Sequence, residues 1–254
     1  MSRRMETLAT IAGYSVAQIG KTLRGNGSAL AKLHNQAWFE SSSKKLPTVS
    51  LEDLFPEGAG LSIRLEHGFP RAKANLTLDE LAVIALICQW LKPSAVFEFG
   101  TFNGRTTLNL AANTPVDAKI YTLDLPAAGE TAFDVETRDS DFHLEERSGS
   151  YFRGTGFSGK IEQLWCDSAR FDEAAFRGLV DLVFVDGAHS YEYVRSDTTK
   201  ALAMVRPGGI ILWHDYCAWY PGVFKHLHEL LPTYPIQHIE GTHLAILSPG
   251  NSLR

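Results

Sequence analysis

The sequence predicts an α/β fold in which a largely parallel β-sheet carries helices on both faces. From residue 75 onward, short apolar segments typical of buried strands alternate with segments of helical periodicity. Residues 1–74 lack such strand patterns, so the regular part of the fold is expected to begin near Asn75. The last two apolar segments flank Gly241 at a spacing typical of a hairpin. Repeated strand–helix units of this kind build a parallel sheet that is covered on both faces.

Residues 1–74 are predicted to form a helical or irregular extension that packs outside the sheet. Helices are expected near residues 8–23 and 29–39. The first would carry an apolar stripe with no partner in the predicted core, which favours a cap or an oligomerisation arm and thus a homodimer. The alternative is that this helix folds back onto the rest of the chain. The stripe consists of Leu8, Ile11, Val16, Ile19 and Leu23.

The first helix of the regular region follows a T-x-x-E capping box formed by Thr77 and Glu80. Its sequence, LAVIALICQWL, is apolar almost all round, which predicts a buried helix. Pro93 is expected to end it.

Seven strands and three further helices are predicted after that point. The strands, in chain order, are AVFEFG, KIYTLDL, KIEQLWCD, DLVFVDG, GGIILWHDY, IQHIE and THLAIL, and the last is expected to run antiparallel to the other six. The helices are expected at residues 105–112, 191–205 and 223–231. Right-handed crossovers place the carboxyl ends of the parallel strands at one edge, where α/β sheets bind ligands. Acidic or histidine side chains lie at these ends: Glu98, Asp124, Asp167, Asp186, His214 and Asp215.

The composition bounds the class of protein. The chain has 254 residues, and its formal net charge of -5 argues against a nucleic-acid partner. Three widely separated cysteines, Cys88, Cys166 and Cys217, predict a reducing compartment and no disulfide framework. No apolar run approaches the roughly 20 residues that span a bilayer, and polar residues interrupt any signal-peptide core. We therefore expect a cytoplasmic protein with no membrane partner.

The turn after the first of these strands reads Gly100-Thr-Phe-Asn-Gly104-Arg. A dinucleotide-binding turn needs G-x-G-x-x-G, because its second glycine lets the backbone approach a pyrophosphate. Phe102 occupies that position and Arg105 the third, which argues against a nicotinamide-dependent oxidoreductase. No Lys-Ser or Lys-Thr pair follows, which argues against a P-loop.

The pattern that remains, E-x-G-x-x-x-G, suits a ligand with a positive end and no phosphate. Glu98 would attract an ammonium group, and Asp124 would accept hydrogen bonds from two ribose hydroxyls. The ordered segments FEFGTFNGRT, YTLDL, WCDSARFD, DLVFVDGAHSYEYVRSD and RPGGIILWHDY resemble class I S-adenosylmethionine-dependent methyltransferases. The resemblance covers about residues 77–247 and looks closest to small-molecule O-methyltransferases.

This resemblance implies a Rossmann-like seven-stranded methyltransferase sheet in residues 75–254. It also implies methyl transfer from S-adenosylmethionine to a small hydroxylated metabolite or a sugar-like acceptor. The residues it assigns to the cofactor run from the methionine part through the ribose to the adenine: Glu98, Gly100, Thr101 and Gly104, then Asp124, then Asp167, with Asp186 near the sulfonium. Two alternatives stay open: both glycines could serve the turn alone, and Asp124 and Asp167 could cap helices.

Two mechanisms of proton removal fit the segments DGAH and WHDY. A sulfonium is already electrophilic, so the enzyme must align the acceptor and remove its proton. In related metal-dependent O-methyltransferases, carboxylates at these strand ends bind magnesium, and Asp186 and Asp215 match them. His214 stands where such enzymes usually place an acid, which argues against magnesium and leaves a softer divalent metal open. The other mechanism, which we favour slightly, is general-base catalysis by His189 or His214, with Asp215 orienting one of them.

Other interpretations of the same residues remain. His189 could cap a helix, and His214 could simply pack at a strand end. The chain could also be a non-catalytic S-adenosylmethionine-binding partner or regulatory module, although the retained polar cluster favours an enzyme. The long connection at residues 126–160 holds Tyr151, Phe152 and Arg153, which could form a lid, bind the acceptor or anchor the connection.

Overall fold

The computed structural model describes residue 39 and residues 45–55, 60–68, 75–126, 130–135 and 148–248. The apolar stripe expected at residues 8–23 lies outside these ranges, so the homodimer stays a prediction. Among the described residues, no helix is both long enough and apolar enough to cross a membrane.

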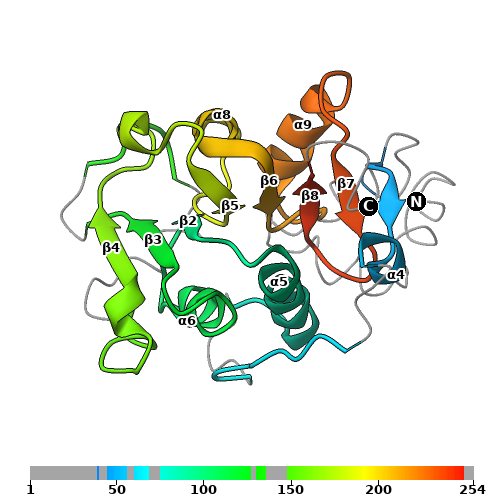
Figure 1. Ribbon diagram of the computed structural model, residues 1–254. Coiled ribbons are helices and arrows are strands. Elements are labelled where there is room, and N and C mark those ends of the chain that lie inside the picture. The colour runs from blue at the N-terminus through cyan, green and yellow to red at the C-terminus, as the bar shows by residue number, and fades with distance from the viewer. Residues whose placement is uncertain are drawn as a thin grey trace, which may run out of the picture.

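The centre of the fold is one eight-stranded sheet (Figure 1). Its order is β1-β7-β8-β6-β5-β2-β3-β4. The strands are β1 Thr48–Val49, β2 Ala95–Phe99, β3 Lys119–Asp124, β4 Ile161–Trp165, β5 Val180–Val185, β6 Val205–Trp213, β7 Gln237–Ile239 and β8 Ala245–Leu247. β8 runs antiparallel to both of its neighbours, β6 and β7, and every other pair is parallel. All seven predicted strands and the antiparallel last strand are therefore confirmed, but the sheet has eight strands, and the prediction of a seven-stranded sheet is wrong.

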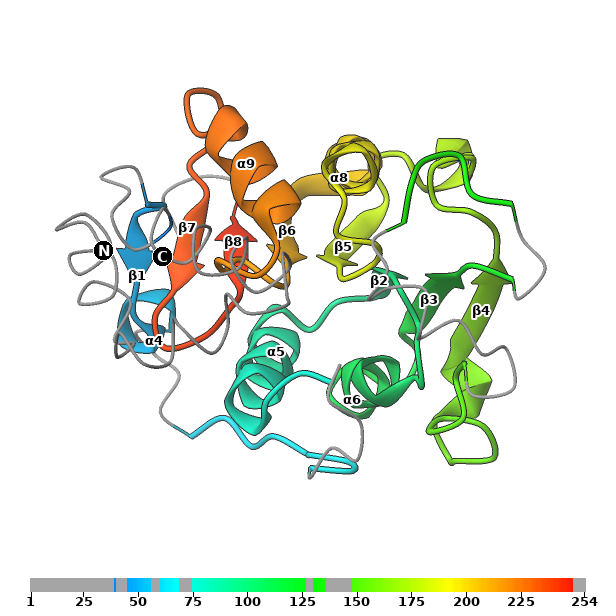
Figure 2. The ribbon, with the colours of Figure 1, turned by 180° about the vertical axis from the view of Figure 1, so that it is seen from behind.

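The extension contributes to the sheet, which corrects the expectation that it packs wholly outside. Thr48 and Val49 pair in parallel with His238 and Ile239 and form β1 at the edge of the sheet. Figure 2 shows β1 at one edge and β4 at the other. A two-residue strand has no period that a sequence pattern can reveal, because its conformation is imposed by the partner strand.

Helices cover both faces of the sheet. α5 (Leu78–Leu91) and α6 (Arg105–Ala112) lie on one side, while α8 (Tyr191–Met204) and α9 (Pro221–Leu230) lie on the other (Figure 1). The short helix α4 (Leu51–Leu54) follows β1, and the 3₁₀ helices η1 (Ser158–Lys160) and η2 (Ala174–Phe176) flank β4. The capping box of α5 is confirmed, since Thr77 and Glu80 cap each other reciprocally, and the helix ends at a left-handed Lys92 just before Pro93.

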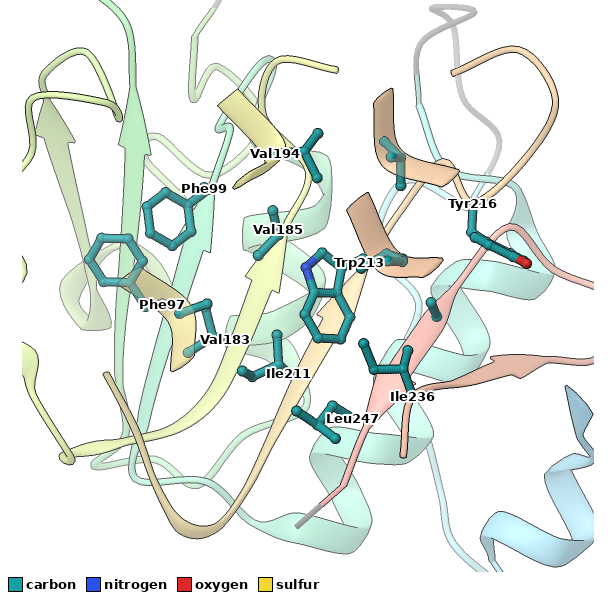
Figure 3. Close-up of a cluster of buried hydrophobic side chains, with 14 of the residues drawn as sticks. Phe97, Phe99, Val183, Val185, Val194, Ile211, Trp213, Tyr216, Ile236 and Leu247 are labelled. Atoms are coloured by element: carbon teal, nitrogen blue, oxygen red, sulfur yellow. The ribbon is translucent and has the colours of Figure 1, made fainter. Parts of the chain in front are cut away.

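Alternation along the strands separates two apolar cores. Phe97 and Phe99 of β2 pack with Trp213 of β6 on the side of α8 and α9, as Figure 3 shows. Val96 points to the opposite face, where it packs with α5 and α6. Each fully buried side chain of this size contributes roughly 1.5–3 kcal/mol to the free energy of unfolding. The same alternation turns Glu98, two residues after Val96, toward α6.

The registers of β2, β5 and β6 align the carboxyl ends of these three strands, where a ligand site can form. Phe99 of β2 pairs with Val185 of β5, which in turn pairs with Trp213 of β6. The residues that follow these three, Gly100, Asp186 and His214, therefore come side by side. Gly100 has φ +94, and a Cβ there would lie 2.2 Å from the carbonyl oxygen of Asp186. Only glycine fits here, because the backbone after β2 passes so close to the backbone after β5.

Candidate active site

A cavity of about 330 Å³ opens at the carboxyl ends of β2, β3, β4, β5 and β6. Its volume falls in the range of about 300–1,000 Å³ that is usual for small-molecule sites. Most of the residues that were predicted to act, in catalysis or in cofactor binding, lie on its lining. They are Gly100, Thr101, Asp124, Asp167, Asp186, His189, His214 and Asp215.

Glu98 lies beneath the cavity and is not among the described residues that line it. Its side chain is fully buried, and Oε2 accepts hydrogen bonds from Thr107 of α6 at 2.5 Å and Thr122 of β3 at 2.6 Å. Oε1 is buried without a hydrogen-bond partner among the described residues. Burial raises the pKa of Glu98 to about 8, against the effect of the two threonines. The carboxyl group is therefore mostly protonated at neutral pH before any cation approaches.

A hydroxyl relay connects Glu98 to the lining of the cavity. Oγ1 of Thr101 lies 2.7 Å from Oγ1 of Thr122. Thr122 has one hydroxyl hydrogen, which goes to Glu98, so Thr101 is the donor of that contact. A change of charge at Glu98 can thus be transmitted to the glycine-rich turn.

Gly104 does not line the cavity; it packs against Phe152 and Gly149. It has φ +79, and a Cβ there would lie 2.6 Å from the ring of Phe152. Gly149 donates a backbone hydrogen bond to the carbonyl of Phe102, and Tyr151 donates one to that of Asn103. Residues 148–152 are therefore docked on the turn, and Phe152 anchors them, as one of the alternatives for this connection expected.

Arg105 has a role that sequence analysis missed. It does not line the cavity, and its side chain donates hydrogen bonds to the carbonyls of His67 at 2.7 Å, Leu76 at 2.7 Å and Gly68 at 2.9 Å. Burial lowers the pKa of Arg105. Arginine at this position thus fastens these three residues to the start of α6. Backbone carbonyls carry no signal in a sequence, which is why the role could not be predicted there.

Asp124, the predicted ribose ligand, ends β3 on the cavity lining. Its Oδ2 accepts a hydrogen bond from Ser148, whose hydroxyl in turn accepts one from Gln163 at 2.7 Å. Its Oδ1 accepts from the backbone N–H of Leu125 at 3.2 Å. A ribose would therefore meet a carboxylate that Ser148 and Leu125 already orient.

Asp167, the predicted adenine neighbour, follows β4 and is nearly buried. Its oxygens accept backbone hydrogen bonds from Ala132 at 2.7 Å and Ala169 at 3.0 Å. The alternative that it caps a helix is wrong, because residues 168–170 form a turn and the chain stays irregular until η2. Tyr193 of α8 lies beside this carboxylate: burial and the neighbouring Asp167 raise the pKa of Tyr193 to about 12.

His214 lies among three carboxylates. Its Nδ1 is 3.0 Å from Oδ1 of Asp186 and 3.3 Å from Oδ2 of Asp215, and its Nε2 is 3.4 Å from Oε2 of Glu80. Burial alone would lower the pKa of His214, but the charges of Asp186 and Asp215 raise it well above its usual value. Burial also raises the pKa of Asp186, although His214 opposes this. His214 is thus held as an imidazolium at neutral pH.

His189 has a different environment. Its Nε2 lies 2.7 Å from Oδ2 of Asp215, and its ring stacks on Tyr220 with centroids 4.0 Å apart. The alternative that His189 caps a helix is not supported, since the residue at the N-cap of α8 is Ser190.

Asp215 joins the two histidines. Burial would raise the pKa of Asp215, but His214 and His189 hold it well below its usual range. Its backbone has φ 60, a left-handed conformation that is uncommon for a residue other than glycine. Its carboxylate contacts both imidazoles through the same oxygen, Oδ2. One side chain therefore sets the positions of both candidate bases.

Glu80 belongs to this cluster, and the sequence assigned it only to capping. One carboxylate oxygen accepts from the backbone of Thr77 and the other from the backbone of His243, both at 2.8 Å. Burial would raise the pKa of Glu80, but the hydrogen bond and charge of His214 and the two backbone donors lower it to about 2. A capping box is a local pattern, so it could not reveal that α5 aims the same carboxylate at the end of β6.

Asp186, His189 and Asp215 each offer one ligand atom, and these atoms lie within 4.8 Å of one another. The structure therefore brings together the two carboxylates that were predicted to hold a metal and adds an imidazole to them. Their roles toward cofactor, metal and acceptor stay predictions.

Comparison with known proteins finds a match for the region that holds most of these residues. Residues 97–216 match a family model described as a methyltransferase domain. No curated protein is significantly similar to the chain in sequence. Among solved structures, the chain resembles the O-methyltransferase TomG of Streptomyces achromogenes, which is involved in tomaymycin synthesis and was solved with S-adenosylmethionine. The two sequences are 18% identical, the alignment covers 85% of this chain and 96% of that chain, and the TM-score is 0.52. It also resembles the Podospora anserina methyltransferase PaMTH1, bound to S-adenosylhomocysteine, at 16% identity, with 72% and 82% covered and a TM-score of 0.51.

Proposed function

We propose that this protein, whose residues 97–216 match a family model described as a methyltransferase domain, transfers a methyl group from S-adenosylmethionine to an oxygen atom of a small hydroxylated acceptor. The observation that carries the proposal is a single cavity with two chemically distinct ends. Asp124 and Asp167 provide carboxylates at one end, and the histidine–carboxylate cluster lies at the other. The solved O-methyltransferases that share the fold support the reaction class.

The residues present fit the cofactor. Asp124 offers an oriented carboxylate for two ribose hydroxyls, and Asp167 and Tyr193 line the neighbouring part of the cavity for the adenine. Glu98 provides a latent negative charge for the amino group, and its Oε2 would transmit that charge to the cavity through Thr122 and Thr101. When bound, S-adenosylmethionine supplies the electrophilic methyl group. The protein then has to place the acceptor oxygen and take its proton.

Within the cluster, we assign the general base to His189 and not to His214. A base must be neutral before it accepts a proton, and His214 is held as a cation by its carboxylates. Asp215 lies 2.7 Å from Nε2 of His189, so it fixes the tautomer in which Nε2 carries the hydrogen and Nδ1 accepts. The acceptor hydroxyl would lose its proton to Nδ1 of His189. Asp215 would then stabilise the imidazolium that forms.

A divalent metal is the alternative for the same step, and the proximity of Asp186, His189 and Asp215 favours it. Two carboxylates and an imidazole suit Mn²⁺ or Zn²⁺ better than Mg²⁺. The acceptor hydroxyl would then lose its proton because its pKa is lowered on coordination. The existing contacts argue for the histidine: His214 already contacts the carboxylates of both Asp186 and Asp215, and a cation held by these two residues and His189 would compete with its imidazolium for them.

The test is turnover of methyl-labelled S-adenosylmethionine against a panel of phenols, catechols and sugar-like alcohols, with and without chelator. Transfer of label that survives chelation supports the histidine mechanism. Transfer that chelation abolishes, and that added metal restores, supports the metal. Tight cofactor binding with no transfer to any acceptor in either condition would favour a non-catalytic binding module.

A further inference from the structure

A second group of potential ligands lies at the end of the cavity that holds the histidine–carboxylate cluster, which we call the acceptor end. Two of the three residues in this group have no part in the proposed reaction. Asp215, Cys217 and His243 each offer one ligand atom, and these atoms lie within 4.8 Å of one another. Asp215 and Cys217 follow β6, and His243 belongs to the turn between β7 and β8. Asp215 and His243 both line the cavity, while Cys217 is buried and does not.

The backbone holds these three residues in place without a ligand. Tyr216 donates a backbone hydrogen bond to the carbonyl of His243 at 2.9 Å, which ties the β7–β8 turn to the segment after β6. His243 in turn donates its backbone N–H to Glu80 at 2.8 Å. Cys217 donates its backbone N–H to the carbonyl of Asp215 at 2.7 Å. A group of side chains on two tied segments loses little conformational freedom when it binds an ion.

The donor atoms fit a thiophilic cation. A thiolate, an imidazole and a carboxylate favour Zn²⁺ or Co²⁺ over Mg²⁺ or Ca²⁺. Both histidine contacts of Asp215 use Oδ2, which leaves Oδ1 for a cation. Glu80 Oε1 lies 3.9 Å from Nδ1 of His243, on the side where carboxylates commonly orient a histidine that binds metal through its other nitrogen.

We propose that Asp215, Cys217 and His243 form a three-ligand site for a zinc-like cation at the acceptor end of the cavity. Three protein ligands leave a fourth tetrahedral position. Because Asp215 and His243 line the cavity, water or an oxygen of the acceptor can reach that position. Binding replaces the Sγ proton of Cys217 by the cation, and the proton goes to solvent. The proposal does not depend on methyl transfer, and it differs from the Asp186–His189–Asp215 arrangement by its sulfur ligand.

Cobalt distinguishes the two arrangements directly. The full-length protein is stripped of metal and titrated with Co²⁺, and the sulfur-to-cobalt charge-transfer band in the near ultraviolet is recorded. We expect one Co²⁺ per chain with that band, displaced stoichiometrically by Zn²⁺. Cys217→Ala should abolish the band, and His243→Gln should weaken Co²⁺ affinity by at least about 100-fold, since loss of groups that only support metal ligands already costs 10–100-fold.

Two other cysteines provide matched controls. Cys166→Ala, on the cavity lining but outside the cluster, and Cys88→Ala, buried in α5, should leave the band intact. The side chain of His243 is half-exposed, so its variant tests the site even if Cys217→Ala disturbs packing. Stoichiometric Co²⁺ without a sulfur band would place the ion at Asp186 and His189 and overturn the proposal. Absence of stoichiometric binding in the wild type would overturn it as well.

Discussion

Nδ1 of His214 lies 3.0 Å from Oδ1 of Asp186, and this pair joins the ends of β6 and β5 inside the cavity. Both side chains are largely buried, and Asp215 and Glu80 add two more carboxylates to the same imidazole. A buried cation with three anionic neighbours is a stabilising element as long as it stays charged. Its charge also removes His214 from the set of groups that can accept a proton near neutral pH.

The first prediction concerns His214→Gln. Removal of one partner from a buried ion cluster costs about 3–5 kcal/mol, so the variant should be clearly less stable at pH 7. In the wild type, the folded-state pKa of His214 is raised, so its stabilisation is fully present below about pH 6.5 and is lost as the pH rises through the folded value. Urea unfolding at a series of pH values checks both effects. A variant as stable as the wild type at pH 7 would contradict the assignment of His214 as a cation.

The second prediction concerns Glu98→Gln. Because burial raises the pKa of Glu98 to about 8, the wild type should lose stability as the pH rises from about 4.5 to 8. The variant should lack this loss and be more stable at pH 9, by a few kcal/mol at most. It should nevertheless bind S-adenosylmethionine more weakly, since no charge can develop for the amino group. Calorimetry at pH 7.5 measures the affinity, and equal affinities would remove Glu98 from cofactor binding.

The third prediction tests the close backbone approach at Gly100. A Cβ at this residue would lie 2.2 Å from the carbonyl oxygen of Asp186, so Gly100→Ala should cost on the order of 3 kcal/mol or more. Gly178→Ala is the matched control, since Gly178 also has positive φ but nothing within 4 Å of the position that a Cβ would take. That change should cost only about 1 kcal/mol. Thermal unfolding of the two variants gives the comparison, and similar losses would mean that φ alone requires glycine at Gly100.

The fourth prediction separates Asp124 from the hydroxyl that orients it. Asp124→Ala should weaken S-adenosylmethionine binding by more than about tenfold, since two hydrogen bonds to a charged acceptor are lost. Ser148→Ala removes only the hydroxyl that donates to Oδ2 of Asp124 and should change the affinity much less. Calorimetric titration of both variants provides the comparison. Unchanged affinity in Asp124→Ala would take this carboxylate out of the site.

The fifth prediction concerns catalysis by His189. His189→Ala should lower kcat by roughly 100- to 10,000-fold, the usual contribution of a general base, and leave cofactor affinity nearly unchanged. His226→Ala, which removes a buried histidine of α9 that does not line the cavity, should keep the wild-type rate if the variant folds. A near-native rate in His189→Ala would move the proton transfer to another group.

Local patterns account for the part of the fold that could be predicted. The capping box of Thr77 and Glu80 and the helix at residues 105–112 depend on neighbours within a few residues, and the structure has both where they were expected. The sequence also predicted that the carboxyl ends of the strands lie together at one edge of the sheet, because parallel strands run in the same direction. β1 could not, because only its pairing with β7 makes residues 48–49 a strand.

The sequence predicted which residues meet in the candidate site, but it did not predict their protonation states. Asp186, His189, His214 and Asp215 were expected to meet, and they do. That His214 is protonated depends on how closely the carboxylates converge on its ring, and Glu80 reaches it from α5, a helix that lies far away in the sequence. Likewise, the burial of Glu98 depends on how α6 covers β2. Such effects arise from tertiary contacts between distant segments, which spacing in a sequence does not encode.

The contacts of Arg105 bear on where this chain can be divided. Its guanidinium is buried, and the acceptors that satisfy it at His67 and Gly68 lie before residue 75, where the predicted division between extension and sheet domain falls. A shortened chain that begins at residue 75 would retain the arginine and lose those acceptors. The residues before the boundary are thus part of the scaffold of the glycine-rich turn, and a transplant of the minimal domain into another protein would need to carry them along.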